Sequence, residues 1–124
     1  MLKLMKTHEQ QLKHLEEFDD AIWINLTNPT DQEINLVSSK LSIPQEHLRA
    51  ALDEEERARI EVDEDCTLIL VDVPLTEVQD GSKIYTTLPL AIILAGDNII
   101  TVCTKELPLI TDFATGKVKA FFTY

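Results

Sequence analysis

Acidic side chains are concentrated in one short stretch of the sequence, between positions 53 and 65. This stretch holds eight carboxylates and two arginines, in a 124-residue chain whose net charge is −11. Four of the carboxylates are consecutive: Asp53, Glu54, Glu55 and Glu56. Hard cations such as Mg²⁺ prefer carboxylate oxygens, and Mg²⁺ keeps several of its waters while accepting one or two carboxylates. These four residues, called the acidic hinge below, are therefore the candidate site for weak Mg²⁺ binding.

The acidic hinge also has a simpler interpretation, as a solvated loop whose arginines pair with nearby carboxylates. The D-x-D-x-D-G pattern of an EF-hand calcium loop is absent from the sequence. The sequence also lacks a phosphate-binding P-loop, a GxGxxG fingerprint, an HExxH zinc motif and a GxSxG nucleophile motif. The three histidines, His8, His14 and His47, are scattered and are interpreted as surface residues. We therefore expect no enzymatic activity.

Helices and strands predicted on either side of the hinge determine where it lies. Thr30 and Glu33 form a capping box, and the apolar spacing that follows predicts a helix over residues 31–41. Pro44 begins a second helix, which ends near Asp53. Beyond the hinge, apolar and charged residues alternate over 58–62, which predicts a strand with a charged outer face. Residues 66–73 are almost continuously apolar and predict a strand covered on both faces.

The remaining elements complete a prediction of one domain over residues 1–124. Strands are expected at 1–6, 21–26, 83–95 and 99–104, while 9–20 fits either a short helix or a strand. Further helices are expected at 107–113 and from 117 onward. The last three strands form an antiparallel meander. The predicted fold class is α/β, a mixed sheet with helices on both faces, that is, an α/β/α sandwich.

Composition excludes several kinds of partner. The net charge of −11 leaves no basic surface for nucleic acid, and an anionic membrane face would repel the chain. No apolar run approaches the roughly 20 residues needed to span a bilayer.

Cys66 and Cys103 lie in apolar runs and are interpreted as buried, reduced thiols of a cytosolic protein. Trp23 is interpreted as a core residue.

Several short segments, in this order and spacing, resemble the cytoplasmic domain of CorA-type magnesium transporters. The segments are Trp23–Leu26, Pro29–Thr30 with Glu33, Leu41–Pro44, Ala51–Asp53, Glu56–Glu61, Asp72–Pro74 and Asp97–Val102. The resemblance covers about residues 20–124. It implies an α/β/α domain that precedes a long stalk helix and two transmembrane helices. It also implies a homopentameric channel for Mg²⁺, sometimes Co²⁺ or Ni²⁺, whose cytoplasmic domains sense Mg²⁺ at subunit interfaces.

The Gly-Met-Asn pore motif of that family does not occur in this sequence, so we expect the chain to be a fragment that cannot conduct ions. The resemblance places the full-length protein at the cytoplasmic face of the cell membrane, with this fragment soluble and linked to the membrane only through a missing C-terminal region. Because pentamers of this kind depend on stalk and membrane helices, we expect the fragment to be a monomer or a weak dimer. The aromatic end of the sequence, Phe121 to Tyr124, fits a chain that continues.

One departure from the family concerns the sensing site. The positions that correspond to the regulatory carboxylates of well-described members are Arg49 and Ala50, and neither can bind a cation. Sensing would then fall to the acidic hinge. An alternative function is that of a stand-alone acidic module that binds a basic protein.

Overall fold

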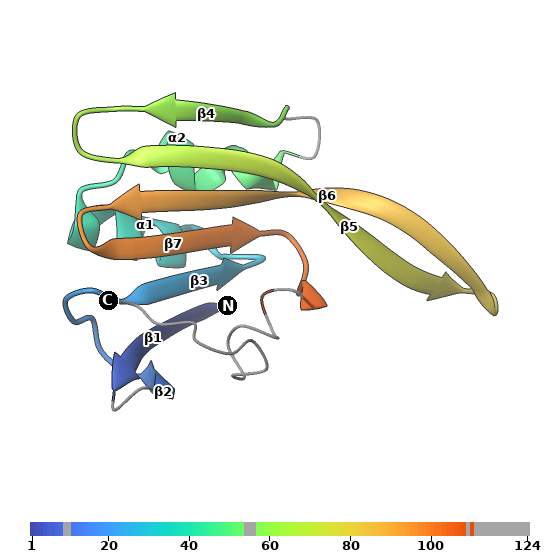
Figure 1. Cartoon of the computed structure of the whole chain (residues 1–124), viewed down its shortest axis with the longest axis horizontal. Helices are drawn as coiled ribbons and strands as arrows, with labels where there is room; N and C mark the ends of the chain where they lie inside the picture. Colours follow the sequence, from blue (N-terminus) through green and yellow to red (C-terminus); the bar gives the residue numbers. More distant parts are fainter. Residues whose placement is uncertain (9–10, 54–56, 109, 111–124) are drawn as a thin grey trace.

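A single sheet of seven strands forms the body of the protein, and its strand order differs from the order of the sequence (Figure 1). The structure, a computed structural model, describes residues 1–8, 11–53, 57–108 and 110. The strands are β1 (Leu2–His8), β2 (Gln11–Leu15), β3 (Trp23–Thr27), β4 (Arg59–Val62), β5 (Thr67–Gln79), β6 (Ser82–Ala95) and β7 (Asn98–Cys103). They lie in the order β2-β1-β3-β7-β6-β5-β4. Only β3 and β7 pair in parallel, so the sheet is mixed, as predicted.

Two short helices connect β3 to β4. Helix α1 (Asp31–Leu41) begins at the predicted capping box, in which the Thr30 side chain accepts from the Glu33 backbone N–H and the Glu33 carboxylate accepts from Thr30 N–H. Helix α2 (Gln45–Arg49) follows Pro44 and continues into a 3₁₀ turn, η1 (Ala50–Leu52). Both predicted helices are therefore confirmed.

The hydrophobic core has two parts, one on each face of the sheet. On one face, α1 and α2 bury Ile34, Val37 and Leu48 against Leu68 and Ile100. On the other face, the central residues are Met5, Trp23, Leu88, Leu90, Cys103, Leu107 and Ile110. Both cysteines are buried and free, as predicted, and they belong to different parts of the core.

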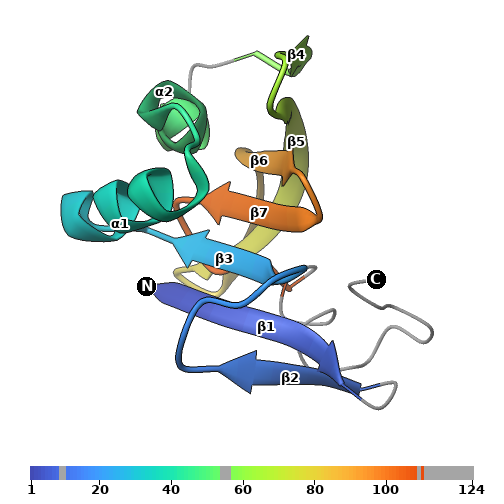
Figure 2. The same ribbon diagram turned by 90° about the vertical axis from the view of Figure 1, so that its left-hand side faces the viewer.

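The predicted α/β/α sandwich is wrong. Figure 2 shows α1 and α2 on the same side of the sheet. On the opposite side, helical backbone among the described residues is limited to Pro108 and Ile110, beside the buried Leu107. The predicted helices at 107–113 and beyond 117 lie mostly outside the described residues. Helical periodicity shows that a helix has a buried face but does not show which sheet face it covers. Because both helices belong to the single connection from β3 to β4, they reach the same face.

The orientation of β4 also differs from the prediction. Ile60 and Val62 point away from the helices and are 69% and 75% exposed, whereas Arg59 and Glu61 are on the helix side. Register explains the difference, because directly opposed residues of an antiparallel pair share a face and Glu61 is paired with the fully buried Leu68. The outer face of β5 is likewise only partly covered, so the prediction that this strand is covered on both faces is wrong.

Strands β5 and β6 continue past the body of the sheet as a long hairpin arm (Figure 1). Its two-residue turn is Asp80-Gly81, with φ of 51° and 79°, a combination that matches the twist of a tight hairpin and that glycine adopts without strain. Pro89 pairs with Asp72 on β5, but β7 pairs with β6 only from Ala91 to Ala95. Pro89 therefore occupies a local sheet edge, where its missing N–H breaks no pairing.

Buried hydrogen bonds join β3 to β7 at the centre of the sheet. Trp23 is 2% exposed, as predicted for a core residue, and its indole Nε1–H donates to Thr101 Oγ1 at 2.8 Å. The Thr101 hydroxyl in turn donates to Asn25 Oδ1 at 2.8 Å. One hydroxyl therefore satisfies two buried polar groups across a parallel strand pair.

We predict that Thr101→Val destabilises the protein by about 1–3 kcal/mol, because it removes both hydrogen bonds while keeping shape and strand propensity. The measurement is the free energy of unfolding in urea. Thr104→Val is the matched control: its hydroxyl is buried without a hydrogen-bond partner among the described residues, so its loss should be neutral or slightly stabilising. Equal destabilisation by the two substitutions would contradict the assignment.

Candidate functional site

The acidic hinge lies between η1 and β4. Asp53 follows η1 with extended backbone and an exposed side chain. The other three predicted ligands, Glu54, Glu55 and Glu56, lie outside the described residues. Of the predicted Mg²⁺ site, the structure thus places only Asp53, at the surface end of the helical connection.

The carboxylates that follow the hinge occupy a different environment. Glu64 and Asp65 are exposed in the turn between β4 and β5. Glu61 accepts a hydrogen bond from Arg59 Nε at 2.7 Å, and this bond is the main reason that the pKa of Glu61 is lowered. The second oxygen of Glu61 points instead toward the ring of His47. The five carboxylates of the acidic stretch that the structure describes therefore do not form one site.

His47 is the centre of a compact group of polar side chains. Its Nδ1 lies 3.4 Å from Cys66 Sγ, and its Nε2 lies 3.3 Å from Asp63 Oδ2 and 3.6 Å from Glu61 Oε2. The imidazole is 9% exposed, and Cys66 is 6% exposed. Burial raises the pKa of the Cys66 thiol, and the charges of Asp63 and Asp65 raise it further. The four residues His47, Glu61, Asp63 and Cys66 are called the His47 cluster below.

Local geometry explains how the His47 cluster forms. The backbone N–H of Asp63 donates to Cys66 C=O at 2.9 Å and closes the turn between β4 and β5. Asp63 and Cys66 thus stand at the two ends of one tight turn. Helix α2 places His47 against them from the helix side of the sheet.

Sequence reasoning missed this cluster because it treated all three histidines as surface residues. His14 is indeed exposed, but His47 is buried. A signal was present, since His47 is four residues before the buried Ala51 and therefore falls on the inward face of the same helix. Its partners could not be identified in this way, because they depend on the register of β4 against β5.

The cluster has the residue types of a cysteine nucleophile with a histidine base, yet its environment disfavours that chemistry. The thiolate is the reactive form of cysteine, and burial and negative neighbours oppose its formation at Cys66. With no cation bound to favour the thiolate, a buried thiol of raised pKa is a poor nucleophile. The arrangement is better suited to holding a cation or to a closed hydrogen-bonded network than to catalysis.

Arg49 and Ala50, the two positions that the resemblance associates with sensing, have structural roles here. Arg49 Nη1 forms an exposed ion pair with Asp31 Oδ1 at 3.0 Å. Ala50 is 6% exposed and packs in the helix-side core. A carboxylate at position 50 would be buried, so its charged form would carry a large desolvation cost.

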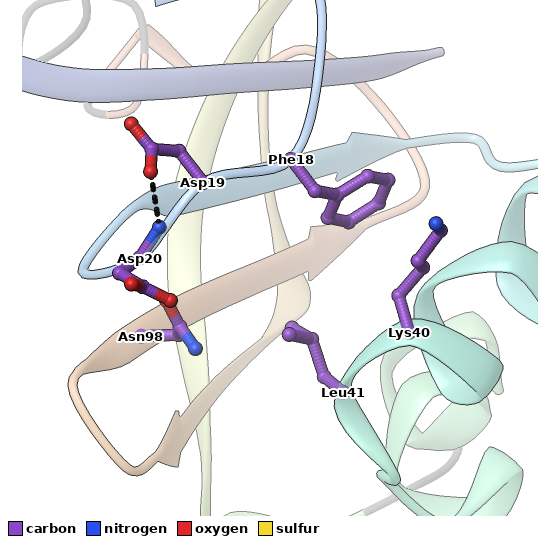
Figure 3. A pocket seen from close by; sticks show the side chains of 6 residues that line it. All are labelled: Phe18, Asp19, Asp20, Lys40, Leu41 and Asn98. Atoms are coloured by element: carbon purple, nitrogen blue, oxygen red, sulfur yellow. Dashed lines mark hydrogen bonds between the residues drawn. The ribbon is translucent and has the colours of Figure 1, made fainter.

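A separate surface pocket of about 320 Å³ lies between α1 and the segment before β3 (Figure 3). Its lining residues are Phe18, Asp19, Asp20, Lys40, Leu41 and Asn98. Lys40 lies over the Phe18 ring at 6.0 Å, and Lys6 pairs with Asp19 at 3.1 Å. A backbone hydrogen bond from Asp20 lowers the pKa of Asp19, and Lys6 lowers it further. Charges of both signs meet here, and the geometry does not favour a particular ligand.

Comparison with known proteins identifies the family. A sequence model described as "CorA-like Mg²⁺ transporter protein" matches residues 18–116 of this chain. The chain belongs to the CorA-like family. The cobalt/magnesium transport protein CorA of Methanocaldococcus jannaschii is 34% identical over 95 residues, which are 75% of this chain and 28% of that protein. Since the family is one of transporters, the expectation of a protein that is not an enzyme agrees with it.

Solved structures of CorA have the same fold. The soluble domain of CorA from M. jannaschii superposes with a TM-score of 0.78 and 26% identity, over 94% of this chain and 46% of that one. The complete structure of the CorA magnesium transporter from the same organism gives a TM-score of 0.72 and 25% identity, over 98% of this chain and 39% of that one. The chain therefore spans less than half the length of each of these relatives. Within the described ranges, none of the helices has the length and apolar character needed to cross a bilayer.

We predict that both cysteines resist alkylation by iodoacetamide in the folded, chelator-treated protein. Burial raises the pKa of both thiols, so labelling should begin only above the ordinary cysteine value of about 8.5. Stability should fall above this pH, because the unfolded state then loses thiol protons that the folded state retains. Intact-mass spectrometry follows the labelling, with the urea-unfolded chain as the control. Fast labelling of Cys66 at pH 7 would instead identify an accessible nucleophile.

Proposed function

We propose that this chain is the cytoplasmic domain of a CorA-like transporter of Mg²⁺ or another divalent cation. In this proposal the domain senses the cation at subunit interfaces and regulates transport, while the conducting pore lies elsewhere in the full-length protein. Membership of the CorA-like family carries the proposal. The likeness to the soluble domain of a CorA protein supports it, because 94% of this chain is covered.

The charge distribution is compatible with a cation-sensing surface. Residues 1–65 contain 16 acidic and 7 basic residues, a net charge of −9, whereas the rest of the chain contributes −2. A surface with one predominant sign attracts counter-ions over several ångströms, and this attraction weakens as salt increases. Asp53 belongs to this surface and is exposed. The acidic hinge is therefore the part of this surface that we assign to Mg²⁺.

Exposed apolar side chains support an interface with another subunit. Ile60, Val62 and Leu94 lie on the sheet face away from the helices and are 69%, 75% and 41% exposed. Apolar side chains that remain in water contribute binding energy when a partner covers them. A basic protein partner, the alternative function, would instead use the acidic face around the hinge.

We predict that about 10 mM MgCl₂ raises the melting temperature more than NaCl of the same ionic strength, because a ligand that binds the folded state stabilises it. Circular dichroism or scanning fluorimetry measures the melt. Identical melts in the two salts would rule out specific sensing by this chain and would leave its family unchanged.

Two charge-matched variants locate the response. The first neutralises the acidic hinge, with Asp53→Asn, Glu54→Gln, Glu55→Gln and Glu56→Gln. The second neutralises four acidic residues elsewhere, with Glu16→Gln, Glu17→Gln, Asp20→Asn and Asp72→Asn. Both raise the net charge by four, so a non-specific charge effect would change both responses alike. Only the hinge variant should lose the Mg²⁺-specific increase.

We also predict that the 124-residue chain is a monomer of 14.1 kDa, or a weak dimer at high concentration, in light scattering after size exclusion. The reason is that the described residues contain no helix longer than α1 that could add interface area, and specific interfaces bury about 1,200–2,000 Å² in total. A stable pentamer of this chain alone would contradict the prediction and would assign the assembly energy to this domain.

A further inference from the structure

We propose that the His47 cluster is a binding site for a borderline transition-metal ion such as Zn²⁺, with His47, Asp63 and Cys66 as ligands. One ligand atom from each of these three residues lies within 4.8 Å of the other two. Glu61 Oε2 lies 3.6 Å from His47 Nε2, the ring nitrogen that does not contact Cys66, and adds negative charge beside the site. The site is distinct from the acidic hinge, because its donors come from α2 and from the β4–β5 hairpin.

The donor types select the metal. Thiolate and imidazole favour Zn²⁺ and similar ions, whereas Mg²⁺ favours oxygen ligands and retains its waters. A set of one sulfur, one nitrogen and one or two carboxylate oxygens falls within the combinations that bind four-coordinate zinc. The His47 cluster should therefore prefer Zn²⁺ or Co²⁺ over Mg²⁺, the opposite of the acidic hinge.

The distances are close to those of an occupied site. In tetrahedral zinc coordination, ligand atoms lie about 3.3–3.6 Å apart, given metal–ligand bonds of about 2.0–2.3 Å. An ion can bind only one ring nitrogen of His47, and at Nδ1 the separation from Cys66 Sγ, 3.4 Å, already matches. Asp63 Oδ2 lies 3.3 Å from the other ring nitrogen, Nε2, and would have to rotate toward Nδ1. The longest distance between any two of the three ligand atoms is at most 4.8 Å, and it would have to shorten by about 1 Å. Side-chain rotation can supply this, since Asp63 is 55% exposed and lies at the end of a turn.

The burial pattern is that of a site with a fixed side and an open side. His47 and Cys66 are held in the core by α2 and β5, so two donors are in place before any ion arrives. Asp63 and Glu61 face solvent and can admit the ion. Donors held in advance reduce the entropy cost of binding. Exposed carboxylates at the open side attract the cation.

Cobalt substitution tests the proposal on the reduced 124-residue chain. Tetrahedral Co²⁺ gives intense visible bands, and a cobalt–thiolate bond adds a charge-transfer band in the near ultraviolet. We expect both bands to saturate at one Co²⁺ per chain, to disappear when Zn²⁺ is added, and to persist in excess Mg²⁺. Pale, octahedral Co²⁺ spectra without the charge-transfer band would overturn the proposal, because they would indicate surface carboxylates alone. The absence of any binding would also overturn it and would leave a closed hydrogen-bonded cluster.

Matched substitutions assign the ligands. Cys66→Ser should abolish the charge-transfer band, while Cys103→Ser, at the other buried cysteine, should retain it. Asp63→Asn should weaken Co²⁺ binding at least about tenfold, while Asp65→Asn, two residues along the same turn, should change it less than about twofold. The Asp63 and Asp65 pair keeps the test decisive if Cys66→Ser does not fold, because both aspartates are exposed. A band that survives Cys66→Ser, or equal effects at Asp63 and Asp65, would refute the assignment.

The outcomes are separable from those of the proposed function. The melting experiments can show Mg²⁺ stabilisation that requires the acidic hinge even if the cluster does not bind Co²⁺. They can also show no Mg²⁺ stabilisation while the cluster does bind Co²⁺. The Co²⁺ spectra therefore test the His47 cluster independently of the Mg²⁺ melting experiments.

Discussion

The parallel pairing of β3 with β7 is the contact on which the rest of the structure depends. Among the described strands, it is the only pairing that joins the N-terminal strands β1, β2 and β3 to the meander of β4 to β7. Its side-chain contacts link residues 76 to 78 positions apart, including Ile22 N–H to Asn98 Oδ1 and Trp23 to Thr101. Such distant contacts carry a large loop-closure cost. Buried hydrogen bonds and the burial of Trp23 and Ile100 at this seam offset that cost.

This pairing also determines the placement of the helices and, through them, of the polar groups. Because β7 lies beside β3, the chain leaving β3 must cross the sheet to reach β4 at the far edge, and α1 and α2 form that crossing. Their apolar sides cover one face of the sheet. At the edge strand β4, this cover ends, and the helix-side positions Arg59 and Glu61 remain partly exposed. His47 lies at this boundary between core and solvent, where a polar group can be buried and still have charged neighbours.

Features that depend on neighbours in sequence were predictable. The capping box at Thr30 was identified correctly because its chemistry is local. The orientation of β4 was not predictable. Alternation of apolar and charged residues defines the two faces of a strand but does not show which face meets the helices. The burial of His47 had a local signal in helical spacing, whereas its proximity to Asp63 and Cys66 arises from strand register and helix docking together. The acidic hinge was recognised from composition alone, and composition does not define a ligand geometry.

The His47 cluster takes its residues from both sides of the acidic hinge in the sequence. His47 precedes the acidic hinge, and Asp63 and Cys66 follow it, with His47 and Cys66 19 positions apart. Contacts within the His47 cluster therefore hold together the two segments that the hinge connects. An ion bound in the cluster would strengthen this closure, because its ligands come from both segments.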